Sequence, residues 1–301
     1  NLAPADKKLY ALRDVTATVD SIPLIASSIM SKKIAAGSSA ILLDIKMGSG
    51  AFMKTQSDAL ELARSMVSIG KSAGRKTAAI VTDMDVPLGA AIGNALEIAE
   101  AVEILQGKGP ADLRETSLTL AADMLRLIGR GGFDECRKLA EKALADGSAF
   151  RTFRAMTEAQ GGDVSCLDRP EKLPQAAFRQ EIALPAYGFI TQMDTEAIGR
   201  AACLLGAGRE TKGSSIDMAA GIRLLKKTGD YAETNEPIAI LYTSEEDRLA
   251  AAADLYRSAL ALGEEPPAPR PKLFARVTED SFSASAPKIG TADGCRPKTK
   301  G

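Results

Sequence analysis

The segment Ala40-Ile-Leu-Leu-Asp-Ile45 is an apolar run of the kind that lies buried on both faces of a parallel sheet. A second run of this type, Thr77-Ala-Ala-Ile-Val-Thr82, follows residues 57–72, whose apolar side chains have helical spacing. A strand, a crossover helix and a second strand make one right-handed βαβ unit. This stretch therefore predicts an α/β fold with a largely parallel sheet.

A helix is predicted immediately before the first strand, beginning after Asp20-Ser21 and ending at Gly37. Its isoleucines, spaced three and four apart, would pack inward. Ser28 and Lys32 are four residues apart and therefore lie one turn above the other on a neighbouring face. Taken alone, a serine and a lysine on a helix are usually ordinary surface residues. The inward stripe consists of Ile22, Ile25 and Ile29.

The remainder of the chain divides at a proline-containing linker over residues 169–174. Before it, helices are predicted over 94–105, 115–128, 133–145 and 149–161. After it come short strands over 180–191, a helix over 195–205, a strand and its return over 221–230 and 237–242, a helix over 245–262 and a last strand over 272–277. We expect a helical segment at 1–37, an α/β domain at 38–170, a small C-terminal α+β domain at 171–277 and a tail at 278–301.

Composition limits the class of ligand. The chain has 301 residues, 45% of them hydrophobic, and a net charge of −1, which gives no electrostatic footprint for nucleic acid or an anionic membrane. No apolar run reaches the ~20 residues that a membrane span needs. We therefore expect a cytoplasmic protein with small-molecule ligands and no nucleic-acid or membrane partner.

The chain contains no histidine, so neither a serine–histidine nor a cysteine–histidine pair can be assembled from it. Its four cysteines are scattered without a Cys-x-x-Cys pair, which favours free thiols over a zinc site. Gly206-x-Gly208 lacks the third glycine and the preceding buried strand of a dinucleotide fingerprint. Catalysis must rest on Arg, Lys, Ser and carboxylates. The cysteines are Cys136, Cys166, Cys203 and Cys295.

Several long motifs resemble those of one enzyme family. Tyr10-Ala-Leu-Arg-Asp-Val-Thr-Ala-Thr-Val-Asp-Ser-Ile-Pro-Leu-Ile25 is similar to the pyrimidine-base-binding segment of the thymidine and pyrimidine-nucleoside phosphorylases. The similarity continues in order through residues 44–54, 83–97 and 204–212. It covers roughly Leu2 to Ala275 and leaves only the tail outside.

The resemblance implies a pentosyltransferase that carries out reversible phosphorolysis: a pyrimidine nucleoside and phosphate give the free base and a pentose 1-phosphate. Arg13 and Lys32 match the family residues that hold the pyrimidine carbonyls, and Ser28 matches the residue that bonds the base edge near its ring N–H. A fixed cation beside those carbonyls stabilises the departing anionic base more than the neutral substrate, which is the condition for catalysis.

The resemblance also implies a monovalent cation site, usually for potassium, made by backbone carbonyls and one glutamate. Residue by residue, these ligands fall on Leu88, Ala91 and Glu100. Oxygen ligands suit a hard cation. By composition alone, a glutamate on this helix would be read as part of a solvated face. Relatives are homodimers and use phosphate as co-substrate with no organic cofactor, so we expect the same here.

Two alternatives remain open at this stage. The chain does not begin with methionine and lacks the family's glycine-rich phosphate loop, so it resembles the family's latter two thirds. One alternative is a non-catalytic pyrimidine-binding protein without that loop. The other is a phosphoribosyltransferase of the anthranilate type. Such an enzyme would need a pyrophosphate-binding loop and acidic residues for magnesium, and the visible motifs fit it less well. The preference for thymidine or uridine stays open.

Overall fold

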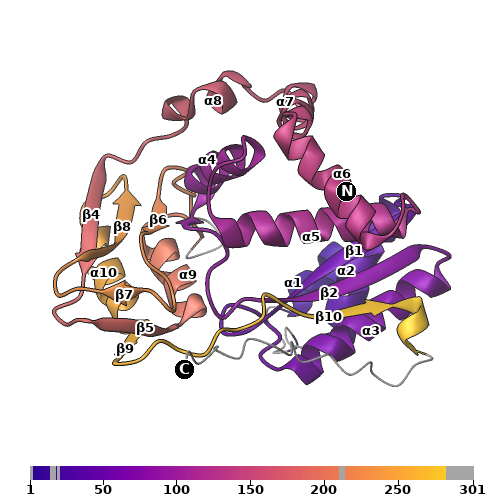
Figure 1. Ribbon diagram of the computed structural model, residues 1–301, viewed down its shortest axis with the longest axis horizontal. Coiled ribbons are helices and arrows are strands. Elements are labelled where there is room, and N and C mark those ends of the chain that lie inside the picture. Colours follow the sequence, from indigo (N-terminus) through magenta and orange to yellow (C-terminus); the bar gives the residue numbers. More distant parts are fainter. Residues whose placement is uncertain (1–2, 14–17, 19–20, 210–213, 283–301) are drawn as a thin grey trace, which may run out of the picture.

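A computed structural model describes residues 3–13, 18, 21–209 and 214–282 of the chain. Figure 1 shows a helix-flanked sheet at the N-terminal end and a second, strand-rich module at the other end, with helix α5 between them. The fold is therefore α/β with a C-terminal α+β module, as the sequence predicted. Within the described residues, no helix is long and apolar enough to span a membrane.

The first sheet confirms the predicted βαβ unit. Strands β1 (Ala40–Met47) and β2 (Lys76–Asp83) pair in parallel, and helix α3 (Gln56–Ser72) connects them. Thr55 caps this helix by accepting a hydrogen bond from the Asp58 amide, which satisfies one of its free N–H groups. β2 is buried along almost its whole length because it lies in the centre of the sheet.

The last strand of the chain belongs to this first sheet. β10 (Leu273–Thr278) pairs antiparallel with the far edge of β2, with a register shift between Leu273 and Ala275. The sequence analysis correctly expected a strand here but grouped it with the C-terminal module. Periodicity along one strand carries no information about which edge supplies its hydrogen-bond partners, and the open edge of β2 supplies them.

Helices cover both faces of this sheet (Figure 1). The core beneath α3 and α2 (Ile22–Ala35) includes the alternate residues of β1 that point to that face. α1 (Pro4–Arg13) packs on α2, and α5 (Ala111–Leu127) covers the opposite face. The sequence analysis did not predict α1, and it began α5 four residues late. The core on the α2 and α3 side contains Ile25, Met30, Ile41, Leu43, Ile45, Leu62, Met66, Val67 and Val81.

The helices that follow agree with prediction to within a few residues. α4 (Asn94–Leu105) matches in full, and α6 (Phe133–Ala145) packs on α5. α7 (Ser148–Ala159) continues the helical stretch, and two short helical turns occupy the linker region. These turns are α8 (Ser165–Asp168) and η1 (Pro170–Lys172).

Two antiparallel sheets build the C-terminal module. The four-stranded sheet has the order β3-β6-β8-β4, and the three-stranded sheet has the order β7-β5-β9. The predicted strand and its return are confirmed as β6 and β8. Their bounds are β3 (Ala91–Ile92), β4 (Phe178–Ala183), β5 (Gly188–Met193), β6 (Gly221–Leu224), β7 (Tyr231–Ala232), β8 (Pro237–Thr243) and β9 (Leu260–Gly263).

One predicted helix in this module is too long. The sequence analysis expected a helix over 245–262, whereas α10 (Arg248–Ser258) ends earlier and residues 260–263 form β9. β9 pairs with β5, so the backbone after the helix finds its partners in a sheet. α9 (Thr195–Leu204) matches the prediction, and η2 (Glu279–Phe282) follows β10.

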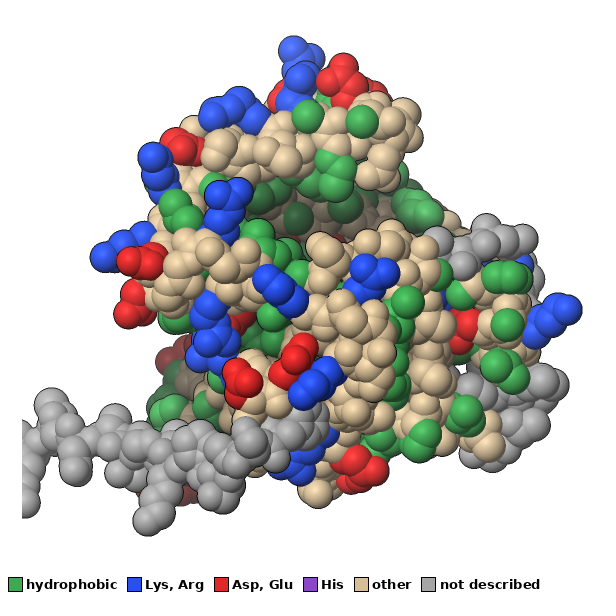
Figure 2. Space-filling model, turned by 90° about the vertical axis from the view of Figure 1, so that its right-hand side faces the viewer, with side chains coloured by type: hydrophobic (Ala, Val, Ile, Leu, Met, Phe, Trp, Pro, Cys, Tyr) green, Lys and Arg blue, Asp and Glu red, His purple; other side chains and the backbone are tan. Residues whose placement is uncertain are grey.

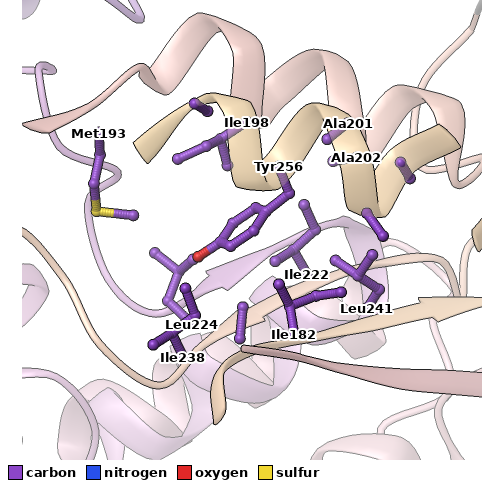
Figure 3. Close-up of a cluster of buried hydrophobic side chains, with 14 of the residues drawn as sticks. Ile182, Met193, Ile198, Ala201, Ala202, Ile222, Leu224, Ile238, Leu241 and Tyr256 are labelled. Atoms are coloured by element: carbon purple, nitrogen blue, oxygen red, sulfur yellow. The ribbon is translucent and has the colours of Figure 1, made fainter. Parts of the chain in front are cut away.

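Tyr256 of α10 lies at the centre of the C-terminal core. Figure 3 shows its ring among Ile198, Ile222 and Ile238, with its hydroxyl directed into the cluster. The side chain is fully buried, and the hydroxyl has no hydrogen-bond partner among the described residues. Burial raises the pKa of Tyr256. The core therefore contains one polar atom whose desolvation is not offset.

We predict that Tyr256→Phe leaves the free energy of unfolding unchanged or raises it by about 1 kcal/mol, because the variant removes an unpaired buried hydroxyl. Thr243→Val is the matched control: that buried hydroxyl donates to the Leu205 carbonyl at 2.8 Å and accepts from the Glu245 amide at 3.2 Å. The control should lose about 1–3 kcal/mol. Urea unfolding measures both, and an equal loss in the two variants would contradict the prediction.

Candidate functional site

Ser28 and Lys32 lie together on α2, as their spacing predicted. The Lys32 Nζ donates to the Ser28 Oγ at 2.9 Å and to the Ser28 carbonyl at 3.1 Å. Ser28 is buried and Lys32 is exposed. Pro23 stands in the first turn of the helix, where its missing N–H leaves no intrahelical bond unmade. The pair therefore forms a polar spot on one face of α2.

The structure adds a third residue to this spot. Asp6 of α1 forms an ion pair with Lys32, with 2.7 Å between Oδ2 and Nζ, and the Asp6 side chain is only 11% exposed. Sequence reasoning missed Asp6 because it and Lys32 belong to different helices. Arg13, the other proposed base-holding residue, is the last residue of α1, but its side chain lies outside the described part of the chain.

The loops at the carboxyl ends of β1 and β2 contact the start of α9 in the C-terminal module. Open α/β sheets commonly bind ligands at this end of their strands. Ser49 donates its amide to Asp85 at 2.6 Å, and its hydroxyl accepts from the Thr195 amide at 3.2 Å. Lys54 pairs with Glu196 at 2.9 Å. A Cβ on Gly50 would lie 2.4 Å from Thr195, so this close approach requires glycine.

A pocket of about 900 Å³ opens between α2, β1 and the loop after β1. Neither Ser28 nor Lys32 lines it. Its wall combines aliphatic side chains with lysines and carboxylates, namely Ile25, Ile29, Lys33, Leu42, Leu43, Asp44, Ile45, Lys46, Gly50, Ala51, Phe52, Met53, Lys54, Leu62, Met66 and Glu196. Around the molecule, on the face drawn in Figure 2, Lys and Arg side chains are interspersed with Asp and Glu side chains and with hydrophobic ones.

Of the three proposed cation ligands, Glu100 contacts the backbone of the segment that contains the other two. Glu100 of α4 is buried, and its carboxylate accepts hydrogen bonds from the amides of Ala90, at 2.8 Å, and Ala91. Gly89 has φ +75°, and a Cβ there would lie 2.2 Å from the Glu100 Oε2. The carboxylate therefore contacts the backbone of residues 89–91. We call residues 88–91 the cation loop.

The electrostatics of Glu100 fit a cation at this loop. Burial raises the pKa of Glu100, although the two amide hydrogen bonds and the charge of Arg223 act in the opposite direction. A carboxylate has about four acceptor positions, so it can bind a cation in addition to two amides. One buried carboxylate with neutral carbonyls suits a hard, singly charged ion. The residues present therefore fit the implied group.

An ion pair lies on the other side of the cation loop. Asp112 of α5 and Lys227, which follows β6, are 2.5 Å apart, and both bond the backbone of Gly89. Burial alone would raise the pKa of Asp112, but the hydrogen bond and charge of Lys227 hold it below its ordinary value. Sequence reasoning missed both residues, since nothing in the local pattern links two positions so far apart in the chain.

The two groups of candidate residues lie apart. Figure 1 shows α2 with the first sheet and α4 beside the C-terminal module, with α5 between them. Among the described residues, no group of three or more Cys, Asp or Glu side chains could hold a metal ion. Cys136, Cys166 and Cys203 are free thiols, and Cys295 lies outside the described residues.

Two family models match separate parts of this chain. Residues 1–150 match the family model described as the a/b domain of a glycosyl transferase family, and residues 189–263 match the pyrimidine nucleoside phosphorylase C-terminal domain. A pyrimidine-nucleoside phosphorylase from Bacillus subtilis (strain 168) is 54% identical over 248 residues, which are 82% of this chain and 57% of the relative. The chain belongs to the pyrimidine-nucleoside phosphorylase family.

Two other pyrimidine-nucleoside phosphorylases match with similar identity and coverage. The pyrimidine-nucleoside phosphorylase of Geobacillus stearothermophilus is 54% identical over 247 residues, and that of Staphylococcus haemolyticus (strain JCSC1435) is 53% identical over 248. Each match covers 82% of this chain and 57% of the relative. The chain thus spans a little over half the length of the curated phosphorylases that it matches, and the family resemblance of the sequence motifs is confirmed.

We predict that Gly89→Ala destabilises the protein more than Gly74→Ala does. Both glycines have positive φ, so each alanine carries a backbone cost of about 1–2 kcal/mol. A Cβ on Gly74 meets nothing within 4 Å, whereas one on Gly89 displaces the Glu100 carboxylate from the cation loop. Denaturant unfolding of the two variants measures the difference. Equal losses would show that Glu100 is not fixed against the loop.

Proposed function

We propose that the protein to which this chain belongs catalyses the reversible phosphorolysis of pyrimidine nucleosides to free base and (deoxy)ribose 1-phosphate. It would be a pentosyltransferase with inorganic phosphate as co-substrate and no organic cofactor. The observation that carries the proposal is the 54% identity to a pyrimidine-nucleoside phosphorylase over 248 residues. The ion-paired Lys32 beside buried Ser28 supports it.

Arg13, Ser28 and Lys32 would hold the base. As the glycosidic bond breaks, the sugar gains positive charge and the departing pyrimidine gains negative charge, which its carbonyl oxygens share. Lys32 and Arg13 would stabilise that negative charge, and Ser28 would bond the base edge near the ring N–H. Asp6 would hold the Lys32 ammonium beside Ser28, and because the three N–H groups of Lys32 already have partners in Ser28 and Asp6, one of these bonds would be exchanged for a base carbonyl on binding.

A potassium ion would bind the cation loop through the carbonyls of Leu88 and Ala91 and the Glu100 carboxylate. When bound, the ion would neutralise a carboxylate whose burial disfavours ionisation. Its support in this chain is the contact of Glu100 with the loop backbone.

We further propose that residues 1–37 belong to a helical base-binding domain, 38–170 to the phosphate-side domain and 171–277 to the C-terminal domain except for β10, which pairs with the first sheet, with 278–301 as a tail. Closure of the first two domains would bring nucleophile and sugar together and exclude water. By family resemblance, the helical domain would form the contact of a homodimer. A cytoplasmic location fits an enzyme that acts on nucleosides and phosphate.

The test is an assay of uridine and thymidine cleavage by the full-length protein with and without phosphate. Phosphate-dependent release of the free base supports the proposal, and the ratio of the two rates gives the nucleoside preference. Activity that instead needs pyrophosphate or a 5-phosphoribosyl 1-pyrophosphate donor would favour a phosphoribosyltransferase. Binding of pyrimidine without any cleavage would favour a non-catalytic binding protein.

We predict that Lys32→Ala in the full-length protein lowers the phosphorolysis turnover number by about 10²–10³, because it removes one donor to a developing anion. The control is Lys71→Ala, which removes an exposed lysine in the last turn of α3 that lies outside both the pocket wall and the proposed base contacts. Steady-state kinetics with saturating phosphate measure both variants. Unchanged turnover in Lys32→Ala, or an equal loss in Lys71→Ala, would overturn the base-holding role.

A further inference from the structure

The cation loop is fastened to the C-terminal module through its backbone. The Leu224 amide donates to the Ala90 carbonyl at 2.7 Å, and β3 pairs with β6 through Ala91 and Arg223. A Cβ on Gly93, just after β3, would lie 2.4 Å from the Ala220 carbonyl, so the two backbones approach closely. β3, which begins at the last residue of the cation loop, is therefore an edge strand of the C-terminal sheet.

Lys227 reaches the same loop from that module. Its Nζ donates to the Gly89 carbonyl at 2.8 Å and to the Asp112 Oδ2 at 2.5 Å. The same Asp112 oxygen accepts from the Gly89 amide at 3.3 Å. One ion pair therefore bonds both backbone polar groups of Gly89. Its two side chains are about one-fifth exposed, so water competes weakly for these bonds.

These contacts fix the orientation of the cation loop. Gly89 has positive φ and no side chain, so without external bonds its peptide groups would be among the least restrained in the loop. Glu100 restrains the loop on one side, and the Asp112–Lys227 pair restrains it on the other. Leu88 and Ala91, whose carbonyls are the proposed ligands, lie within two residues of Gly89. Their directions therefore depend on how the Gly89 peptide is held.

We propose that Lys227 is a positioning residue of the cation site, through which the C-terminal module sets the affinity of the cation loop for a monovalent cation. The proposal rests on the cation site of the proposed function and adds a residue from a distant part of the chain. Because Asp112 balances its charge, Lys227 orients the loop without placing an uncompensated positive charge beside the ion. Pre-organised ligands bind a cation with less loss of conformational freedom.

The preceding residue provides a matched control. Lys226 makes an ion pair of similar geometry, with 2.7 Å between its Nζ and the Glu236 Oε2, and also bonds the Tyr231 carbonyl. Both of its partners belong to the C-terminal module. Lys226→Met thus removes a comparable ion pair from the same segment and leaves the contacts of Gly89 in place.

The experiment measures the melting temperature of the chain and its variants against potassium chloride, with choline chloride added to keep ionic strength constant. We expect potassium to raise the melting temperature of the wild type and of Lys226→Met with the same half-saturating concentration. Lys227→Met should need about tenfold more potassium, which corresponds to about 1.4 kcal/mol of binding free energy. Lys227→Arg, which keeps the charge and the donors, should restore most of the affinity.

Each outcome has a definite meaning. An unchanged or lower half-saturating concentration in Lys227→Met, or an equal increase in Lys226→Met, overturns the positioning role. If Lys227→Met does not fold, Lys227→Arg and hydrogen exchange at the Gly89 and Ala90 amides decide, since a displaced loop exchanges faster. If potassium does not stabilise the wild type, the cation site and this proposal both fail. Phosphate-dependent nucleoside cleavage is measured separately and decides the proposed reaction.

Discussion

The backbone pairing of β3 with β6 joins the two ends of this molecule. It consists of few residues, but it holds the chain that leaves the first sheet against the edge of the C-terminal sheet. Buried N–H and C=O groups require partners, so this edge pairing restricts where the cation loop and α4 can lie. Glu100 can reach the loop amides because α4 begins directly after β3. The candidate cation site thus depends on a contact between distant parts of the chain.

Three buried or partly buried carboxylates are compensated by groups from other elements. Asp112 meets Lys227, Asp6 meets Lys32, and Glu100 meets the amides of the cation loop. Desolvating a carboxylate without such a partner is costly, so each of these contacts fixes the relative position of the elements it joins. These charged contacts therefore hold the elements in position at the same places where binding of a base or a cation is proposed.

Carboxylates at the end of β2 are also compensated by cations from another segment. Asp83 is nearly fully buried, and Arg270 and Lys272, which precede β10, lie at 3.6 and 3.5 Å from its two oxygens. Arg270 also pairs with Asp85. The segment that returns from the C-terminal module to the first sheet thus carries the cations that compensate the carboxylates at the carboxyl end of β2. β10 follows these residues directly and completes the first sheet.

Strong local patterns decided much of the fold in advance. β1 and β2 were predictable from their apolar runs, and α3, α4 and α6 from the helical spacing of their apolar residues. An element that is buried on one or both faces needs apolar side chains at regular positions, and these positions can be recognised in the sequence. Short strands carry no such signal. β3 has only two residues, which is too few to show an alternation of apolar and polar side chains. The apolar residues of β9 fit the helical spacing of α10, so the sequence analysis assigned them to that helix, whereas in the structure they pair with β5 as a strand.

Some residues of the candidate site could be found from the sequence, and others only from the structure. The sequence by itself determined that Ser28 and Lys32 share a helix face, because four residues make nearly one helical turn. Family motifs marked Arg13, Leu88, Ala91 and Glu100. Only the tertiary structure decided that Asp6 pairs with Lys32 and that Asp112 and Lys227, 115 residues apart, meet at Gly89. Charge attraction between groups on different elements has no sequence period, so their pairing depends on the packing of the whole chain.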